Sequence, residues 1–503
     1  MKFKTFLAGC LGGLLSLNSC TNSPDMTDYT AYVNPFIGTG GHGHTFPGAI
    51  VPHGMISPSP DTRIDGWDAC SGYYYADSTI NGFSHTHLSG TGCCDYGDVL
   101  LMPTVGEQKY LPTGSQSQQM AYASAFSHQN ETAEPGYYSV FLDTYQVKAE
   151  LTASKRAAIH RYTFPESKEA GFILDLDYSL QRQTNKEMEI EVISPTEICG
   201  RKKTMYWAFD QYINFYAEFS KPFTYTLVTD SMALDDGGRL LPTCKALLHF
   251  DTTKDEQVFV KVGISAVDIE GARKNVETEI PDWDFDGVRK DARKAWNETL
   301  SKIDITTNDK DDETIFYTAL YHTAISPNLF TDVDGRYLGM DLQVHQGDTL
   351  NPMYTIFSLW DTFRALHPLM TIIDPDLNNA FIRSLIKKHQ EGGIFPMWDM
   401  ASNYTGTMIG YHAVPVIVDA YMKGDRNFDI QEAYRACVRA AEYDTTGIKC
   451  PDLVLPHLMP KAKYYKNSIG YVPCDRENES VAKALEYAYD DWCISVFADA
   501  LND

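Results

Sequence analysis

One change in residue pattern, near Pro281, limits most strongly which folds this chain can adopt. Residues 28–280 contain short runs rich in Tyr, Thr, Val and Phe, and Gly, Pro, Asn and Asp separate these runs. Such runs are typical of antiparallel strands, so we predict a large N-terminal β-sandwich domain over residues 28–280. The length of 503 residues exceeds what one hydrophobic core usually serves, which agrees with two domains or more.

Helical patterns replace the strand patterns after this point. Residues 281–305 are charged and place Val288, Ala292 and Trp296 four apart, which predicts a helical linker. Residues 306–503 hold about six further helical stretches without strand patterns between them, as in an α/α toroid or solenoid. A closed toroid of six helix pairs needs about twice as many helices. The last stretch also reaches Asp503 without a glycine cap, so we expect the helical domain to be incomplete in this chain.

The first twenty residues, MKFKTFLAGCLGGLLSLNSC, have the pattern of a secretory signal, with an early lysine and a short apolar run. Leu17 to Cys20 resembles the lipobox of bacterial lipoproteins, in which the cysteine is lipidated; the alternative is an ordinary signal peptide cleaved nearby. We therefore expect export, to the periplasm or as an outer-membrane lipoprotein of a Gram-negative bacterium. A lipid on Cys20 would then be the only contact with the membrane.

The charge excludes one class of partner. With 42 Lys and Arg against 67 Asp and Glu, the formal net charge is −25, which repels nucleic acids and anionic membrane surfaces. A neutral or cationic substrate fits better.

Of the 11 cysteines, nine follow the predicted leader at irregular spacings, so we expect mostly buried thiols with at most one or two disulfides.

A glycine-rich and histidine-rich stretch, GGHGHTFPGAIVPHGM, begins at Gly40. It is not a phosphate-binding loop, because no helix start and no lysine follow the glycines. His42 and His44 have H-x-H spacing, which His85 and His87 repeat. Two such pairs are compatible with zinc, but isolated histidine pairs are more often structural groups that form hydrogen bonds. The remaining interpretation is a tight loop that presents imidazoles to a polar ligand.

Two aromatic positions have both a structural and a functional interpretation. Trp67 is either a core residue or a platform for the apolar face of a sugar. In SLWDTFR, Asp361 and Arg364 are three apart on a predicted helix, so they either pair with each other or bind vicinal hydroxyls while Trp360 stacks on the ring. The motif GGIFPMWD is either a helix end with a packed turn or a second site that joins Trp to Asp.

Several long motifs occur in an order that identifies a family. They are VNPFIGTGGHGHTFPGAIVPHGM, SGYYYADSTINGFSHTHLSGTG with CDYGDVLLMP, SLWDTFRALHPLM, GGIFPMWD, MIGYHAVPVIVDAYMKG and ALEYAYDDWC. From about Tyr32 to the final residue, the chain resembles glycoside hydrolase family 92, a family of calcium-dependent exo-acting α-mannosidases. The resemblance implies an N-terminal β-supersandwich, a helical linker and an (α/α)6 catalytic domain. It also implies Ca²⁺ as cofactor, a mannose-containing glycan as substrate, and hydrolysis with inversion by a Glu acid and an Asp base.

Carried over by motif, the resemblance implies that Asp361 binds the terminal mannose, with Trp360 and Arg364 beside it. It also implies that Trp67 lies near the leaving-group side. His42, His44, His85 and His87 occupy family motifs without an assigned sugar contact.

The family motifs that carry the acid, the base and most calcium ligands belong downstream of ALEYAYDDWC and do not occur in this sequence. We therefore expect the chain as given to be inactive. The alternative function, from a different class, is a non-catalytic carbohydrate-binding lipoprotein.

Overall fold

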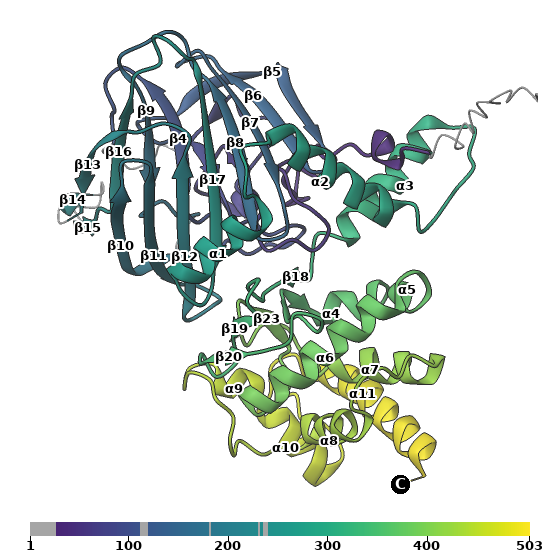
Figure 1. Cartoon of the computed structure of the whole chain (residues 1–503). Helices are drawn as coiled ribbons and strands as arrows, with labels where there is room; N and C mark the ends of the chain where they lie inside the picture. Colours follow the sequence, from purple (N-terminus) through teal and green to yellow (C-terminus); the bar gives the residue numbers. More distant parts are fainter. Residues whose placement is uncertain (1–26, 111–118, 181–182, 230–231, 235–239, 503) are drawn as a thin grey trace, which may run out of the picture.

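The computed structural model describes residues 27–110, 119–180, 183–229, 232–234 and 240–502. The predicted signal peptide, including Cys20, lies outside this part of the chain. Figure 1 shows a β-rich domain above a helical domain, with a helical linker at the side of the β-rich domain. This confirms the order of a β-rich domain followed by a helical domain. Within the described residues, no helix is long and apolar enough to cross a bilayer.

Two antiparallel sheets pack against each other in the N-terminal domain. The six-stranded sheet has the order β1-β3-β4-β9-β16-β13, and the nine-stranded sheet has the order β10-β11-β12-β17-β8-β7-β6-β5-β2. Aromatic residues fill the space between them, as where Phe172 of the first sheet meets Phe219 of the second with ring centroids 5.6 Å apart. The strands are β1 (Ser59–Asp61), β2 (Thr79–Ile80), β3 (Gly82–Ser84), β4 (Leu100–Val105), β5 (Ser124–Glu134), β6 (Tyr137–Leu142), β7 (Val147–Ala153), β8 (Ala157–Thr163), β9 (Ala170–Asp175), β10 (Thr184–Ser194), β11 (Glu197–Met205), β12 (Gln211–Phe219), β13 (Thr224–Val228), β14 (Met232–Leu234), β15 (Leu240–Pro242), β16 (Lys245–Phe250) and β17 (Gln257–Ser265).

Helix α1 (Ile269–Glu279), which the sequence interpretation did not foresee, lies against the nine-stranded sheet. Gly263 permits this close packing, because a Cβ there would lie 2.3 Å from the backbone oxygen of Ala272. Helix α2 (Phe285–Leu300) lies within residues 281–305, where the sequence pattern predicts a helical linker. It buries Trp296, whose indole donates a hydrogen bond of 2.5 Å to the backbone oxygen of Ile50.

The helical part contains α3 (Lys310–Thr323), α4 (Leu359–Thr362), α5 (Leu366–Ile373), α6 (Pro375–Gly392), α7 (Ala413–Lys423), α8 (Ile430–Ala441), α9 (Leu455–Leu458), α10 (Lys461–Ile469) and α11 (Ser480–Leu501). Helix α3 packs on α2 and on the short helix η1 (Tyr29–Tyr32), apart from the other helices (Figure 1). Local signals set several ends: Asp374 caps α6, and Gly393 and Gly424 end α6 and α7 at φ 91° and 102°.

Two expectations for this region are wrong. One of the predicted helical stretches is WDTFRALHPLMTII, residues 360–373, and it is interrupted between α4 and α5, where Ala365 leaves the helical region at φ −142°. Short strands also lie among the helices, where none was expected, because the 328–404 segment forms two-residue and three-residue pairings along the junction with the sandwich. These strands are β18 (Asn328–Leu329), β19 (Arg336–Leu338), β20 (Val344–Gln346), β21 (Tyr354–Thr355), β22 (Phe357–Ser358), β23 (Trp398–Met400) and β24 (Asn403–Tyr404).

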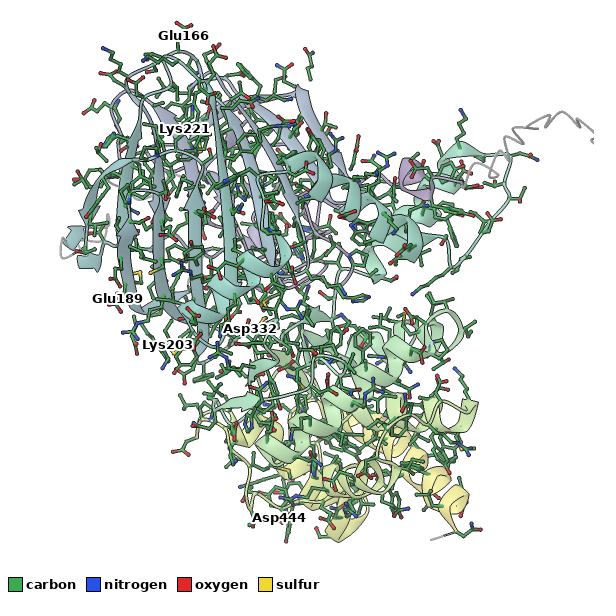
Figure 2. All side chains as sticks on the ribbon, in the orientation of Figure 1. Glu166, Glu189, Lys203, Lys221, Asp332 and Asp444 are labelled. Atoms are coloured by element: carbon green, nitrogen blue, oxygen red, sulfur yellow. The ribbon has the colours of Figure 1, made fainter. Side chains whose placement is uncertain are left out.

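Hydrogen bonds connect the two domains at their junction. His53 of the sandwich donates its backbone N–H to Ala324, accepts from the backbone of Leu329, and bonds through Nδ1 to the oxygen of Pro327 at 2.8 Å. The buried carboxylate of Asp332 accepts from Ser265 at 2.6 Å and from Asn275 at 2.9 Å, and Figure 2 labels it where the two parts meet. The domains are therefore held by specific polar contacts as well as by apolar packing.

Candidate functional site

The glycine-rich loop that begins at Gly40 supports an exposed tryptophan. His42 Nδ1 lies 2.6 Å from Asp68 Oδ1, and the rings of His42 and His44 lie 5.0 and 4.3 Å from the ring of Trp67. A Cβ at Gly92 would lie 2.6 Å from Trp67 Nε1, so only glycine lets this backbone approach the indole. Trp67 nevertheless remains 55% exposed. The core alternative for Trp67 is therefore wrong, and the indole forms a supported surface platform.

His85 and His87 lie elsewhere and are fully buried. His85 bonds to the oxygen of Val99 and stacks on His160, and burial lowers its pKa to about 4. His87 bonds to the oxygen of Ser57 through Nδ1 and meets both Asp61 and Ser84 through Nε2. A catalytic triad needs the serine and the carboxylate on opposite ring nitrogens, so this arrangement is a structural one.

The two histidine pairs do not converge on a metal site. His42 and His44 gather at Trp67, whereas His85 and His87 are separately engaged inside the sandwich. In the described part of the chain, no three His, Cys, Asp or Glu side chains are placed to hold a metal ion. Calcium takes about six to eight oxygen ligands, often from several carboxylates, and no group of three or more Asp or Glu side chains placed for a metal ion lies among the described residues.

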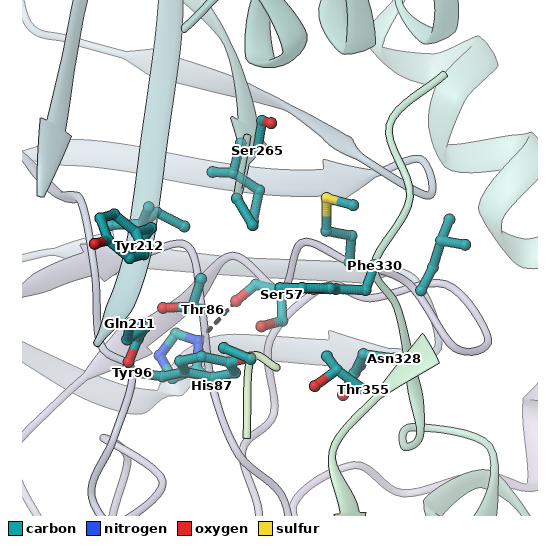
Figure 3. Close-up of a pocket in the computed structure, with 16 residues that line it drawn as sticks. Ser57, Thr86, His87, Tyr96, Gln211, Tyr212, Ser265, Asn328, Phe330 and Thr355 are labelled. Carbon is teal, nitrogen blue, oxygen red and sulfur yellow. Dashed lines mark hydrogen bonds between the residues drawn. The ribbon is translucent and has the colours of Figure 1, made fainter. Parts of the chain in front are cut away.

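A small cavity lies where the sandwich loops meet the helical part. Figure 3 shows His87, Thr86 and Tyr96 on one side of it and Asn328 and Thr355 on the other. Its volume is ≈ 30 Å³. That is room for about one water molecule, whereas small-molecule pockets measure roughly 300–1,000 Å³. This cavity is therefore part of the domain junction and is too small for a sugar.

The WDTFR motif lies at α4. Ser358 Oγ donates to one carboxylate oxygen of Asp361 at 2.5 Å, and the other has no partner within the described residues. Arg364 pairs with Glu486 of α11 at 2.8 Å, so the suggested Asp361–Arg364 pair is wrong. The Arg364 guanidinium lies 4.6 Å from the ring centroid of Trp360. Because Arg364 is held elsewhere, the exposed carboxylate of Asp361 remains available for hydrogen bonds from a ligand.

A network behind this motif contains His412 and Glu486, which the sequence analysis did not single out. His412 lies between Glu486 and Asp490, with its nitrogens 3.4 and 2.8 Å from the two carboxylates, and its ring stacks on Phe363 at 4.3 Å. Burial raises the pKa of Asp490. Glu486 and Asp490 are four apart on one helix and therefore lie on the same face, so their spacing could have predicted that they contact the same side chain. Within this network, Glu486 also pairs with Arg364 and so fixes the position of its guanidinium.

Adjacent carboxylates on α11 diverge, as neighbouring positions on one helix must. Asp490 faces His412, whereas Asp491 forms an ion pair with Lys466 at 2.7 Å. They do not form a catalytic pair.

The GGIFPMWD motif is structural. Asp399 pairs with Lys388 at 3.1 Å and accepts from Thr355 at 2.8 Å, and the side chains of Asp399 and Lys388 are both 0% exposed. Trp398 is buried against Trp207 with ring centroids 5.9 Å apart. Of the two interpretations of this motif, the packed turn is the one that the structure supports.

Comparison with known proteins accounts for both halves of the chain. The model of the glycosyl hydrolase family 92 N-terminal domain matches residues 32–265, and that of the glycosyl hydrolase family 92 catalytic domain matches residues 271–503. The family models thus place the chain among the glycosyl hydrolases. It belongs to glycosyl hydrolase family 92, which confirms the resemblance seen in its motifs.

Solved structures agree with this assignment. The chain is 37% identical to a family GH92 α-mannosidase from Bacteroides thetaiotaomicron, with a TM-score of 0.86 over 95% of this chain and 63% of that one. It is 30% identical to a family GH92 inverting mannosidase from Bacteroides thetaiotaomicron VPI-5482, with a TM-score of 0.82 over 95% and 63%. An uncharacterized secreted glycosidase of Arthroderma benhamiae is 26% identical over 94% of this chain and 60% of that protein. The chain thus spans about 60% of the length of these relatives.

Proposed function

We propose that a protein of full family length containing this chain removes terminal mannose from α-mannosides, as in N-glycans or mannans, with inversion and with Ca²⁺. Family membership and the names of the solved relatives support this reaction, and one of those relatives was solved with mannoimidazole. The observation in this chain that carries the proposal is the exposed Asp361, whose carboxylate has one oxygen without a partner among the residues that the structure describes. A carboxylate placed in this way accepts hydrogen bonds from vicinal hydroxyls.

Residues of this chain would bind and orient the sugar. Asp361 accepts from hydroxyls of the terminal mannose, and Arg364, fixed by Glu486, keeps Trp360 in place beside it. The indole of Trp67 offers its apolar face to the next sugar, with His42 and His44 holding its edge. His85 and His87 are internal supports of the sandwich.

The proton-transfer groups belong, by the family resemblance, to motifs downstream of ALEYAYDDWC. Calcium, held there by oxygen ligands, would polarise the sugar hydroxyls. The β-supersandwich and (α/α)6 toroid are likewise proposed for the complete fold. The secreted description of one relative and the leader pattern support export, with Cys20 as the proposed lipidation site.

The experiment is mannose release from an α-mannoside by the protein of family length. We expect release that EGTA abolishes and added Ca²⁺ restores. Activity that persists without calcium contradicts the cofactor, and release of a different sugar contradicts the substrate. Binding of α-mannosides without any release favours the alternative of a non-catalytic carbohydrate-binding lipoprotein.

A further inference from the structure

A second concave surface lies on the outer face of the nine-stranded sheet, over β5, β6 and β7. Its volume is ≈ 650 Å³, within the range of about 300–1,000 Å³ that small-molecule sites occupy. Figure 1 shows these strands at the far side of the sandwich from helices α6 to α11. Neither Trp67 nor Asp361 is among the residues that line this outer trough, as we call it.

Strand register and one helix create the outer trough. Ser139 and Phe141 of β6 share one face of the sheet; Thr132 of β5 lies opposite Ser139, and Lys148 of β7 lies opposite Phe141. Helix α2 covers the neighbouring position, where the Arg289 guanidinium lies 3.5 Å from the ring centroid of Tyr137. Arg289 lies near the start of α2, which runs from Phe285 to Leu300.

A bulge in β5 forms the opposite wall. The β5–β6 register shifts between Phe126 and Glu131, which leaves extra residues on β5. Gln129 and Asn130 belong to these residues and line the outer trough. The open strand surface of the outer trough therefore lies between α2 on one side and the bulged strand β5 on the other.

The lining offers hydrogen-bonding groups that the protein does not use. The side chains of Gln129, Asn130 and Thr132 have no hydrogen-bond partner in the described part of the chain, and each is exposed. Amides and hydroxyls of this kind donate to and accept from the hydroxyls of a ligand. Phe141, half-buried, adds an apolar ring face for stacking.

The charges in the outer trough are already compensated. Lys148 pairs with Glu150 at 3.2 Å, and Arg289 pairs with Glu134 at 3.0 Å. The formal net charge of −25 further opposes an anionic ligand. Amides, hydroxyls and an aromatic ring without a free charge favour a neutral, polyhydroxylated ligand.

We propose that the outer trough is a second carbohydrate-binding site, which holds a neutral oligosaccharide segment away from the site at Trp67 and Asp361. The choice of a mannose-containing oligosaccharide rests on the proposed function. The neutral saccharide class rests on the lining residues alone.

The test is calorimetric titration of the 503-residue chain with a soluble neutral α-mannooligosaccharide. The background is Asp361→Ala, which removes the main mannose contact. In this background Phe141→Ala should weaken binding about five- to tenfold, the scale for losing one aromatic contact. The matched control is Tyr225→Ala, which removes an aromatic residue that is 50% exposed on β13, outside the outer trough.

Thr132→Val is the second variant, since it removes one exposed hydroxyl with little change of shape. It should weaken binding severalfold, while both trough variants leave mannose release from a small α-mannoside unchanged in the protein of family length. Equal affinity for Phe141→Ala, Thr132→Val and the background overturns the inference, as does the absence of any binding in the background. Because mannose release tests the proposed function separately, the two failures are distinguishable.

Discussion

Asp399 offers the sharpest test of whether a Trp-Asp motif binds sugar or supports the fold. Asp399→Asn keeps the shape of the side chain and an acceptor for Thr355 but removes the charge that faces Lys388. Both side chains are 0% exposed and 3.1 Å apart. Breaking one partner of such a pair costs roughly 3–5 kcal/mol, because the other charge stays buried without compensation. Burial also raises the pKa of Asp399, so its ionised form already carries a desolvation cost. We therefore expect Asp399→Asn to lower the free energy of unfolding by an amount near the lower end of that range, about 3 kcal/mol.

The assay is urea unfolding followed by circular dichroism, with mannoside affinity measured separately in buffer. Lys388→Met with Asp399→Asn should be more stable than Asp399→Asn alone, because no unpaired charge remains. Mannoside affinity should stay at the parent value. A loss of stability below about 1 kcal/mol for Asp399→Asn, the size of a surface effect, together with lost affinity, refutes the structural role.

Three further outcomes follow from the junction and the proposed site. Burial lowers the pKa of His53 to about 4, below its unfolded value of about 6.5, so its stabilising contribution is complete above pH 6.5 and is lost as the pH falls to 4. Unfolding free energies should show this loss, up to about 3 kcal/mol, for the parent but not for His53→Gln, and parallel pH profiles would contradict it. Trp67→Ala should weaken binding of an α-mannobioside about tenfold with little loss of stability, because the ring is 55% exposed; unchanged calorimetric affinity would show that the indole does not contact sugar. Glu486→Gln, which frees Arg364, should weaken mannoside binding severalfold, whereas the matched control Asp491→Asn on the same helix should not, and equal affinities would remove Glu486 from the site.

Local sequence signals predicted the helices well where those signals act alone. Helix α7 spans Ala413–Lys423 and ends at Gly424, where a glycine in the left-handed conformation is a local stop signal. The 360–373 stretch has an equally helical pattern, yet it breaks at Ala365. The same segment pairs with α11, 122 residues away in sequence, through Arg364 and Glu486. No spacing within the motif carries information about such a partner.

The site shows the same division between local and distant information. The H-x-H spacing placed His42 and His44 together, but it did not distinguish them from His85 and His87, which are buried in the sandwich. The indole of Trp67 lies against the backbone of Gly92, 25 positions later in the sequence, and this contact is not visible in the motif. The family motifs named Trp67 and Asp361 as candidates, whereas the contacts of these residues required the three-dimensional structure.

The central claim is that the exposed Asp361 binds the terminal mannose. The most direct measurement is kcat/KM for an α-mannoside with the protein of family length, compared between the parent and Asp361→Ala. The account predicts a reduction of at least ~100-fold, the scale for a charged contact that strengthens in the transition state, with an unfolding midpoint close to that of the parent. A reduction below about tenfold with an intact fold would show that Asp361 only accepts the hydrogen bond from Ser358 and would contradict the account.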